Sequence, residues 1–458
     1  MEKEEKILDD VKEKMQKEKT MKLSVKEGAA ASVMGGFGES YITPFALALN
    51  ANNAQIGLLS SFTGLLGPLS QLKGSKLMEK YSRKKITVTF VALQALMWLP
   101  ILLLSFFFWQ NLFTSYLPII LIIFYSLYAI FGSLAGPSWF SLMGDIVPEK
   151  IRGRYFSRRN TISGIVVLIT TLIAAFLLDL FKTKGLLLLG FSILFFVSGI
   201  FRLISTYILK KHYYPKLKLE KGYYFSFFQF VKKAPYNNFG KFVIYIALIN
   251  FTVQIAAPFF TVYMLKDLGF NYLTFTLVNI SQSIFTLLSL QLWGKFSDKY
   301  GNRELLRIGS ILVPFIPILW LFSSSPIYLM LVVQLVAGIG WAAFNLAASN
   351  FIYDSVSVQR RGICVAYYSL MNGIGIFLGA ALGGLLAQYL IISFMNKLLF
   401  IFLLSGIARL IVSLVMMPKI KEIRQVSKLR ANPFLYIKEI LSPRGMFLEI
   451  VDGIKRKK

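Results

Sequence analysis

The run ITVTFVALQALMWLPILLLSFFFWQNLFTSYLPIILIIFYSLYAIFGSLAGPSWFSLMG, residues 86–144, contains no Asp, Glu, Lys or Arg. A second run without these residues extends from 308 to 353. A membrane-spanning helix needs about 20 consecutive apolar residues, so each run is long enough for two such helices. Both runs are continuously apolar, whereas the strands of a membrane barrel alternate apolar and polar residues. The sequence therefore predicts an all-α polytopic membrane protein.

The rest of the chain follows the same plan. Of its 458 residues, 56% are hydrophobic and 16% are charged, and the mean hydropathy is +0.62. Soluble domains contain fewer apolar residues than this. Apolar runs of about 20 residues predict twelve spans, at residues 28–49, 54–74, 86–109, 115–142, 161–181, 185–209, 242–265, 269–293, 305–324, 327–353, 363–391 and 397–418.

The basic residues lie almost entirely on one side of the predicted membrane. With twelve spans, both termini share a side, and the segments on that side hold 44 of the 50 Lys and Arg residues, against 4 on the opposite side. By the positive-inside rule, the basic side is cytoplasmic. The net charge of +28 is thus explained by topology and anionic membrane lipid, and we expect no nucleic-acid partner. We expect a multi-pass protein of the cell membrane with both termini in the cytoplasm.

Short motifs recur at similar places in the two sets of six spans. The stretch 198–204 (SGIFRLI) resembles 405–411 (SGIARLI), and the Pro-Phe pairs at Pro44 and Pro258 are 214 residues apart. Six spans per half keep both copies in the same orientation, so the pattern predicts parallel repeats. The predicted domain division is an amphipathic N-terminal segment 1–27, a six-helix bundle 28–209, a cytoplasmic linker 210–241, a second bundle 242–418 and a basic tail 419–458.

Two loop motifs carry a family resemblance. Residues 294–303 (GKFSDKYGNR) resemble the G-x-L-a-D-[RK]-x-G-[RK]-[RK] signature of the major facilitator superfamily. Residues 148–154 (PEKIRGR) resemble its second cytoplasmic signature, P-E-x-x-R-G-R. The first-half copy, 75–84 (SKLMEKYSRK), has Ser at both glycine positions and Glu79 in place of Asp. This resemblance implies a twelve-helix fold of two parallel six-helix repeats and indicates no particular substrate.

Acidic residues are scarce on the predicted cytoplasmic side, and several lie beside clustered basic residues. Such charges can pair when the cytoplasmic side is closed and separate when it opens. Asp145 and Asp354 also end apolar spans, where an unpaired charge is costly. We therefore predict a cytoplasmic gate formed by Glu79, Arg83, Asp145, Arg152, Asp298, Arg303, Asp354 and Arg361.

Glu39 is the ionisable residue that lies deepest in a predicted span. It is about 16 Å from either end of the first span, where a charge costs several kcal/mol unless it is paired or hydrated. Three interpretations stay open: a proton-coupling site, a partner for a cationic solute, or a protonated acid that hydrogen-bonds a neighbouring helix. Arg202 and Arg409 lie nearer the cytoplasmic ends, so we expect them to snorkel or to pack against adjoining loops.

Other polar or aromatic residues at mid-depth are candidates for contact with a solute. They are Tyr125, Tyr128, Asn250, Gln254, Asn279, Gln282, Trp341, Asn345 and Asn372. Amides in hydrocarbon either line a cavity or bridge helices, and the sequence does not separate these roles.

Together these features favour a secondary transporter that moves a small solute by alternating access, with protons as a candidate coupling ion. One Cys and one His make a membrane enzyme a poor alternative, and we expect no metal site and no cofactor. The sequence has no phosphate-binding G-x-x-x-x-G-K-[ST] loop for ATP. A sensor or assembly factor on the same fold stays open, because fold does not fix function. We expect a monomer.

Overall fold

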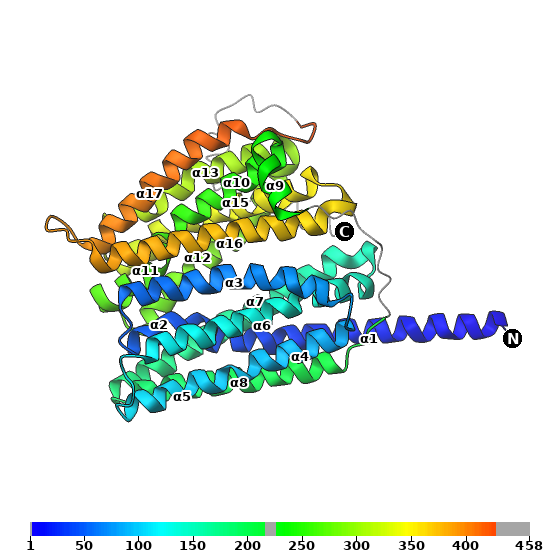
Figure 1. The fold of residues 1–458 in the computed structure, drawn as a ribbon, viewed down its shortest axis with the longest axis horizontal. Helices are drawn as coiled ribbons and strands as arrows, with labels where there is room; N and C mark the ends of the chain where they lie inside the picture. The colour runs from blue at the N-terminus through cyan, green and yellow to red at the C-terminus, as the bar shows by residue number, and fades with distance from the viewer. Residues whose placement is uncertain (1, 216–225, 427–458) are drawn as a thin grey trace, which may run out of the picture. The chain divides into compact units, whose positions relative to one another are not determined.

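The computed structural model describes residues 2–215 and 226–426, and every regular element in this part of the chain is a helix (Figure 1). The α-helices of the first half are α1 (Glu2–Phe37), α2 (Ile42–Ala48), α3 (Asn53–Leu77), α4 (Arg83–Leu96), α5 (Trp98–Trp109), α6 (Leu117–Ile146), α7 (Glu149–Thr183) and α8 (Leu187–Lys210). Those that follow are α9 (Phe227–Lys233), α10 (Asn238–Gln254), α11 (Ala257–Val262), α12 (Tyr272–Tyr300), α13 (Asn302–Leu319), α14 (Pro326–Tyr328), α15 (Gln334–Ser355), α16 (Val358–Tyr389) and α17 (Lys397–Met416).

Each of the twelve predicted spans is occupied by one of these helices or by consecutive helices. Within the described ranges, nine helical stretches are long and apolar enough to cross a membrane. The first, second and ninth predicted spans are the other three. The first is interrupted after Phe37, α3 contains many small and polar residues, and α13 begins with Arg303, Glu304 and Arg307. The predicted all-helical class is confirmed.

The chain divides into two compact units that do not coincide with the sequence halves. The first comprises Met1–Tyr224, Ala247–Ile280 and Gly362–Ser405, and the second comprises Phe225–Ile246, Ser281–Arg361 and Gly406–Lys458. The first unit therefore joins the whole N-terminal half to segments of the C-terminal half. In the second unit, α13 packs on α15.

Helix α1 organises the N-terminal half. It packs against α7 and α8, while α6 packs against α3 and α4. Figure 1 shows its N-terminal turns projecting beyond the other helices of this half. The predicted N-terminal segment 1–27 and the start of the first span thus form one continuous helix. The predicted linker contains the short helix α9, and its residues 216–225, like the tail from 427 onward, lie outside the described residues.

The first span of each half is broken at a corresponding place. After α1 the chain enters a 3-10 turn, η1 (Glu39–Tyr41), before α2. In the second half α10 ends at Gln254, and α11 begins with Pro258 in its first turn. Proline in a first turn is favoured because its missing N–H would have no helical partner there. The first break sets Glu39 at the start of η1, outside the regular α-helix.

Three glycines spaced by four residues allow α16 to approach α10 closely. A Cβ atom at Gly375, Gly379 or Gly383 would overlap the backbone carbonyl oxygen of Ala247, Phe251 or Ile255, respectively. The partner atoms belong to the backbone, so they cannot rotate away. Small residues at this spacing promote close helix packing in membranes.

Substitution of Gly379 by Ala is expected to destabilise the protein by roughly 1–3 kcal/mol, because the added methyl group overpacks the contact with α10. Thermal unfolding of the purified protein in detergent measures this as a lower apparent Tm. Gly136→Ala in α6 is the control, because a Cβ there would meet no described atom within 4 Å. Equal apparent Tm values for the two variants would contradict this account of the packing.

Candidate solute-binding cavity

A cavity of about 550 Å³ lies within the N-terminal half of the chain. Its walls come from η1, α3, α4, α6 and α8. The lining residues are Glu39, Thr63, Gly64, Gly67, Pro68, Gln94, Tyr125, Tyr128, Ala129, Gly132, Ser133 and Arg202. A volume of this size suits a small organic solute. Among the described residues that line it, one carboxylate and one guanidinium are the only charged side chains.

Glu39 is exposed to this cavity and is held by a tyrosine. The hydroxyl group of Tyr128 donates a hydrogen bond to Glu39 Oε1 at 2.5 Å. The ring of Tyr128 stacks on that of Tyr125, with 5.3 Å between centroids and 8° between planes. The described residues place no Lys, Arg or His within ion-pair distance of Glu39. Three of the residues that the sequence predicts therefore lie together in one cavity.

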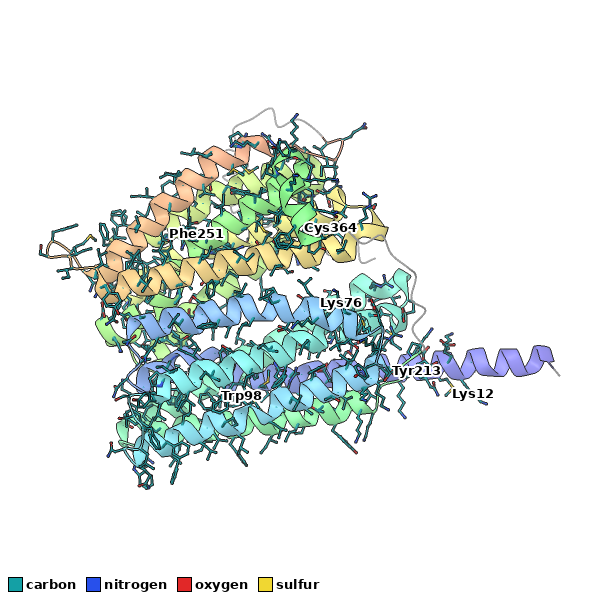
Figure 2. All side chains as sticks on the ribbon, in the orientation of Figure 1. Lys12, Lys76, Trp98, Tyr213, Phe251 and Cys364 are labelled. Atoms are coloured by element: carbon teal, nitrogen blue, oxygen red, sulfur yellow. The ribbon has the colours of Figure 1, made fainter. Side chains whose placement is uncertain are left out.

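Trp98, labelled in Figure 2, packs against Tyr128, one of the residues that line the cavity. It is fully buried, and its ring meets that of Tyr128 edge to face at 5.1 Å. A Cβ on Gly38 would overlap the Trp98 ring. Only glycine therefore fits directly before Glu39, and the close approach fixes the point at which the first span breaks.

Arg202 lines the cavity together with Gln94, which the sequence does not single out. Both Nε and Nη2 of Arg202 donate hydrogen bonds to Gln94 Oε1, and Nη1 donates to Ser205 Oγ at 3.2 Å. A Cβ at Gly132 would overlap the Gln94 amide, so this glycine makes room for the glutamine. The expectation that Arg202 snorkels to the membrane surface or packs against adjoining loops is wrong, because its side chain is only 13% exposed and bonds Gln94 and Ser205 on helices.

A second carboxylate, Glu27, is buried behind Arg202. Its Oε2 lies 3.1 Å from Arg159 Nη2, and its Oε1 lies 3.9 Å from Arg202 Nη1 and accepts a 2.9 Å hydrogen bond from Ser205. The Arg159 guanidinium also lies 4.6 Å from the centroid of the Trp139 ring, within range of a cation–π interaction. Two cations therefore share one carboxylate that is 5% exposed.

The sequence does not identify Glu27, because it falls in a segment rich in charges of both signs. The signal present in the sequence is a polar stripe, Thr20, Ser24 and Glu27, with helical spacing; all three are buried. His212 lies near the same cluster. Burial lowers the pKa of this histidine to about 4, and the nearby Glu27 partly opposes the shift. The ring is therefore neutral at pH 7.

The other predicted cavity residues lie elsewhere. In the first unit, Asn250 and Gln254 belong to α10, Asn279 belongs to α12 and donates to the Phe275 carbonyl, and Asn372 belongs to α16. In the second unit, Gln282 belongs to α12, and Trp341 and Asn345 belong to α15. None of these seven is among the residues that line the cavity.

The predicted gate residues of the N-terminal half pair within that half. Arg83 is buried and donates to Asp145 Oδ2 at 2.6 Å, to Ser141 and to the Pro215 carbonyl. Arg152 donates to the Gly144 carbonyl at 2.9 Å. Glu79 is exposed and makes no ion pair with a described residue.

In the C-terminal half, the predicted gate residues contact the segment after α17. The backbone N–H of Arg303 donates to Glu422 at 2.7 Å, and its Nη1 pairs with Glu304. Asp298 is 81% exposed and lies 4.0 Å from Arg424. The remaining contact joins Asp354 to the amide of Asn302 at 2.6 Å. The side chain of Arg361 lies outside the described residues.

Within the first unit, the two sequence halves meet at the ends of helices opposite these loops. The two carboxylate oxygens of Asp179, on α7, accept hydrogen bonds of 2.8 Å from the backbone N–H groups of Tyr272 and Leu273, at the start of α12. The hydroxyl group of Tyr41 hydrogen-bonds Thr276 at 2.8 Å. A carboxylate of one half thus caps a helix of the other, where the partial positive charge of the helix terminus favours it.

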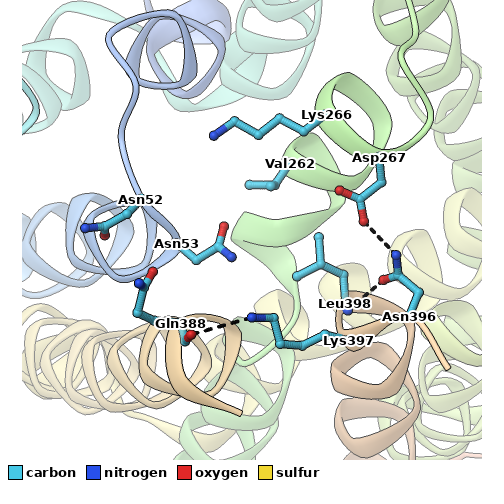
Figure 3. Close-up of a pocket in the computed structure, with 9 residues that line it drawn as sticks. All are labelled: Asn52, Asn53, Val262, Lys266, Asp267, Gln388, Asn396, Lys397 and Leu398. Carbon is cyan, nitrogen blue, oxygen red and sulfur yellow. Dashed lines mark hydrogen bonds between the residues drawn. The ribbon is translucent and has the colours of Figure 1, made fainter. Parts of the chain in front are cut away.

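A second pocket, of about 360 Å³, is lined by residues of both sequence halves within the first unit (Figure 3). Lys266 and Lys397, two of the four lysines on the predicted outer side, line it. Lys266 donates to the Ala51 carbonyl at 3.3 Å, and Asp267 accepts a 2.8 Å hydrogen bond from Asn396. The pocket therefore has two cations and one anion among its lining residues.

The ion pair of Arg83 with Asp145 should contribute more to stability than the exposed pair of Asp298 with Arg424. Asp145→Asn is expected to destabilise the protein by about 1–3 kcal/mol, because it leaves a buried guanidinium without its carboxylate. Asp298→Asn is expected to change stability by less than about 1 kcal/mol, since the pair is exposed. Chemical or thermal unfolding in detergent measures both. Equal losses would mean that Asp145 contributes no more than a surface charge.

Comparison with known proteins agrees with this fold. A family model described as Major Facilitator Superfamily matches residues 28–235 and 242–451. An uncharacterized MFS-type transporter of Methanocaldococcus jannaschii is 24% identical over 380 residues, which cover 80% of this chain and 91% of that protein.

Solved structures show the same fold at lower sequence identity. The nucleoside transporter NupG has a TM-score of 0.60 at 17% identity, covering 89% of this chain and 99% of the other. A bacterial homologue of the iron transporter ferroportin, in an inward-facing state, has a TM-score of 0.64 at 15% identity, covering 89% and 98%. The family match covers both sequence halves and confirms the resemblance of the loop motifs. The chain belongs to the major facilitator superfamily and is a multi-pass membrane protein that acts as a secondary transporter of a small solute.

Proposed function

We propose that the cavity around Glu39 binds the transported solute and that Glu39 takes up and releases a coupling proton. The observation that carries this proposal is the environment of the carboxylate. Glu39 faces a cavity, accepts a hydrogen bond from Tyr128 and has no cation within ion-pair distance among the described residues. Carboxylates inside the membrane-spanning part of a transporter commonly serve as proton relays. Glu39 can take up a proton in this cavity and lose it when the cavity opens to the other side.

Alternating access requires contacts that hold one end of the molecule closed and that can be broken. The contacts of Asp179 with the start of α12 and of Tyr41 with Thr276 fit this requirement, since each joins the two sequence halves through a few hydrogen bonds. We propose that they form the closure on the side opposite the basic loops. The predicted cytoplasmic gate at the other end stays part of this proposal.

The distribution of basic residues supports a proposal for the membrane and the orientation of the protein. We infer that the chain lies in the cell membrane with both termini in the cytoplasm, because 44 of its basic residues lie on one side. Anionic lipid is then the partner of those loops. We propose that the chain acts as a monomer and carries out no catalytic chemistry of its own.

Asp179→Ala is expected to weaken the outer closure, because it removes both hydrogen bonds to the N-terminus of α12. Loss of a helix cap costs about 0.5–2 kcal/mol, so the closed population should fall about 2- to 30-fold relative to the open one. Distances between spin labels on α7 and α12 measure this shift. The single cysteine, Cys364, simplifies preparation of a background for labelling.

Asn271→Ala is the matched control. Asn271 caps the same helix by accepting a 2.8 Å hydrogen bond from Thr274 N–H, but it does not join the two sequence halves. It should therefore weaken the helix end without opening the closure. If both variants gave the wild-type distance distribution, Asp179 would only cap α12 and would not act in closure.

Glu39→Gln is expected to abolish accumulation driven by a pH gradient while solute exchange is retained, because Gln cannot carry the proton. Proton flux and solute exchange in proteoliposomes measure the two activities separately. Glu13→Gln is the charge-matched control, because Glu13 forms a partly exposed ion pair with Lys17 in the N-terminal part of α1. Wild-type proton coupling together with wild-type affinity in the Glu39 variant would show that this carboxylate is only structural.

A further inference from the structure

The charges buried around the cavity do not balance unless Glu39 is ionised. Arg159 and Arg202 share the single carboxylate of Glu27, and the side chains of the three are 14%, 13% and 5% exposed. This cluster therefore has one excess positive charge. Glu39 is the only acid among the residues that line the cavity, and when it is ionised it offsets that excess.

This balance indicates what the cavity holds when Glu39 is protonated. Protonation leaves the positive charge of the cluster uncompensated, and a buried charge without a counter-ion is costly. A solute with a negatively charged group would restore neutrality, whereas a cation would add a second positive charge. We propose that the solute is a small anion, bearing a carboxylate or phosphate group, that binds at Arg202 and enters together with the proton on Glu39. This inference rests on the proton-coupling role proposed for Glu39.

The geometry of Arg202 suits such a group. Its guanidinium has five N–H donors, of which three are used in hydrogen bonds to Gln94 and Ser205. The other two donors, one on Nη1 and one on Nη2, make no hydrogen bond to a described residue, although Nη1 also lies 3.9 Å from Glu27 Oε1. The contacts with Gln94 and Ser205 hold the plane of the guanidinium in place, and a fixed guanidinium is well suited to bind carboxylate or phosphate through two hydrogen bonds.

The repeat in the second half provides an internal comparison. Arg409 corresponds to Arg202 within the repeated SGI-x-RLI motif. It is only 2% exposed and donates to the carbonyl group of Val313. Val313 lies 219 residues after Gln94, the same interval that separates Glu79 from Asp298 in the repeated loops. The second copy of this arginine is therefore almost completely buried, whereas the first copy lines a cavity with a glutamine beside it.

The second pocket, which Lys266 and Lys397 line, also has an excess of positive charge. Figure 3 shows Lys266 and Lys397 extending from their helices toward the side of the pocket where Asn53 lies. Asp267 is the one acid among its lining residues, and it is engaged by Asn396. An excess of positive charge attracts anions and raises their local concentration. The two cavities thus favour the same class of solute.

The pH dependence of binding follows from the groups that face Glu39. These are Tyr125 and Tyr128 on α6 and Arg202 on α8, while the lining residues of α3 and Gln94 on α4 do not titrate. Ionised Glu39 repels an anion at Arg202, and protonated Glu39 does not. Anion affinity should therefore rise as the pH falls.

The test uses the full-length protein in detergent and measures thermal stabilisation at constant ionic strength. The probes are acetate, succinate and inorganic phosphate, compared with tetramethylammonium and glycine betaine, each in mildly acidic and mildly alkaline buffer. At least one anion should stabilise the wild type, more strongly in acid. Glu39→Gln should bind acetate with the same affinity in both buffers, whereas phosphate is compared between variants at one pH only, because its own second ionisation falls between the two buffers. Arg202→Gln should weaken binding by roughly 30-fold or more.

Lys211→Gln is the control for Arg202→Gln, because it removes a positive charge just after α8 and outside the cavity. It should bind the anion like the wild type. If Arg202→Gln does not fold, the loss of pH dependence in Glu39→Gln decides the question. The proposal is overturned if no anion stabilises the wild type, if only tetramethylammonium or betaine does so, or if a folded Arg202→Gln keeps full affinity.

Failure of this inference is distinguishable from failure of the proposed function. Proton-coupled flux of a cation in proteoliposomes would overturn the anion proposal and leave the role of Glu39 intact. Anion binding that depends on Arg202, with no proton flux, would overturn the coupling role of Glu39. It would also contradict the proposal that the anion enters together with a proton.

Discussion

The carboxylate of Glu27 is the contact on which the N-terminal half depends. It is buried on α1 and meets Arg159 from α7 and both Arg202 and Ser205 from α8, so one side chain joins three helices. Arg202 extends the connection to Gln94 on α4. Removing such a carboxylate would leave two guanidinium groups buried without a counter-ion, which is among the most costly changes that a protein interior can undergo. The positions of the cavity walls therefore follow from an ionic contact as well as from apolar packing.

The membrane imposes the second constraint. Backbone polar groups in hydrocarbon must find partners within the protein, so the chain is helical wherever it crosses. A break is tolerated only where the freed groups face protein or a cavity. The break at Gly38 meets this condition, because the chain there packs against Trp98 and the next residue, Glu39, faces the cavity. Close glycine contacts, such as those of α16 with α10, supply the packing that the hydrophobic effect does not provide between helices in lipid.

Much of this architecture could be predicted from the sequence. Runs of apolar residues predict the helices, the short motifs that recur in the two halves predict the repeats, and the depth of Glu39 marks it as exceptional. Tyr125 and Tyr128 are predicted as cavity residues, and they lie beside it. Glu27 is missed because its partners are 132 and 175 positions away in the chain. The hydropathy of the sequence does not indicate which face of α1 packs against α7 and α8, and Glu27 lies on that face. Arg202 is misjudged for a related reason: closeness to a span end favours snorkelling, but a buried acid nearby holds the side chain inside.

The separation of Glu27 from its partners also has a consequence for biosynthesis. Helix α1 is made before the partners of Glu27, since Arg159 follows 132 residues later and Ser205 follows 178 residues later. At ribosomal rates of about 5–20 residues per second, α1 waits on the order of 10 s before these partners exist. During that interval its carboxylate must stay in contact with water or with the insertion machinery. Although α1 precedes α7 and α8 in the chain, it is therefore among the last helices of this half to reach its final place, and α8 completes the assembly.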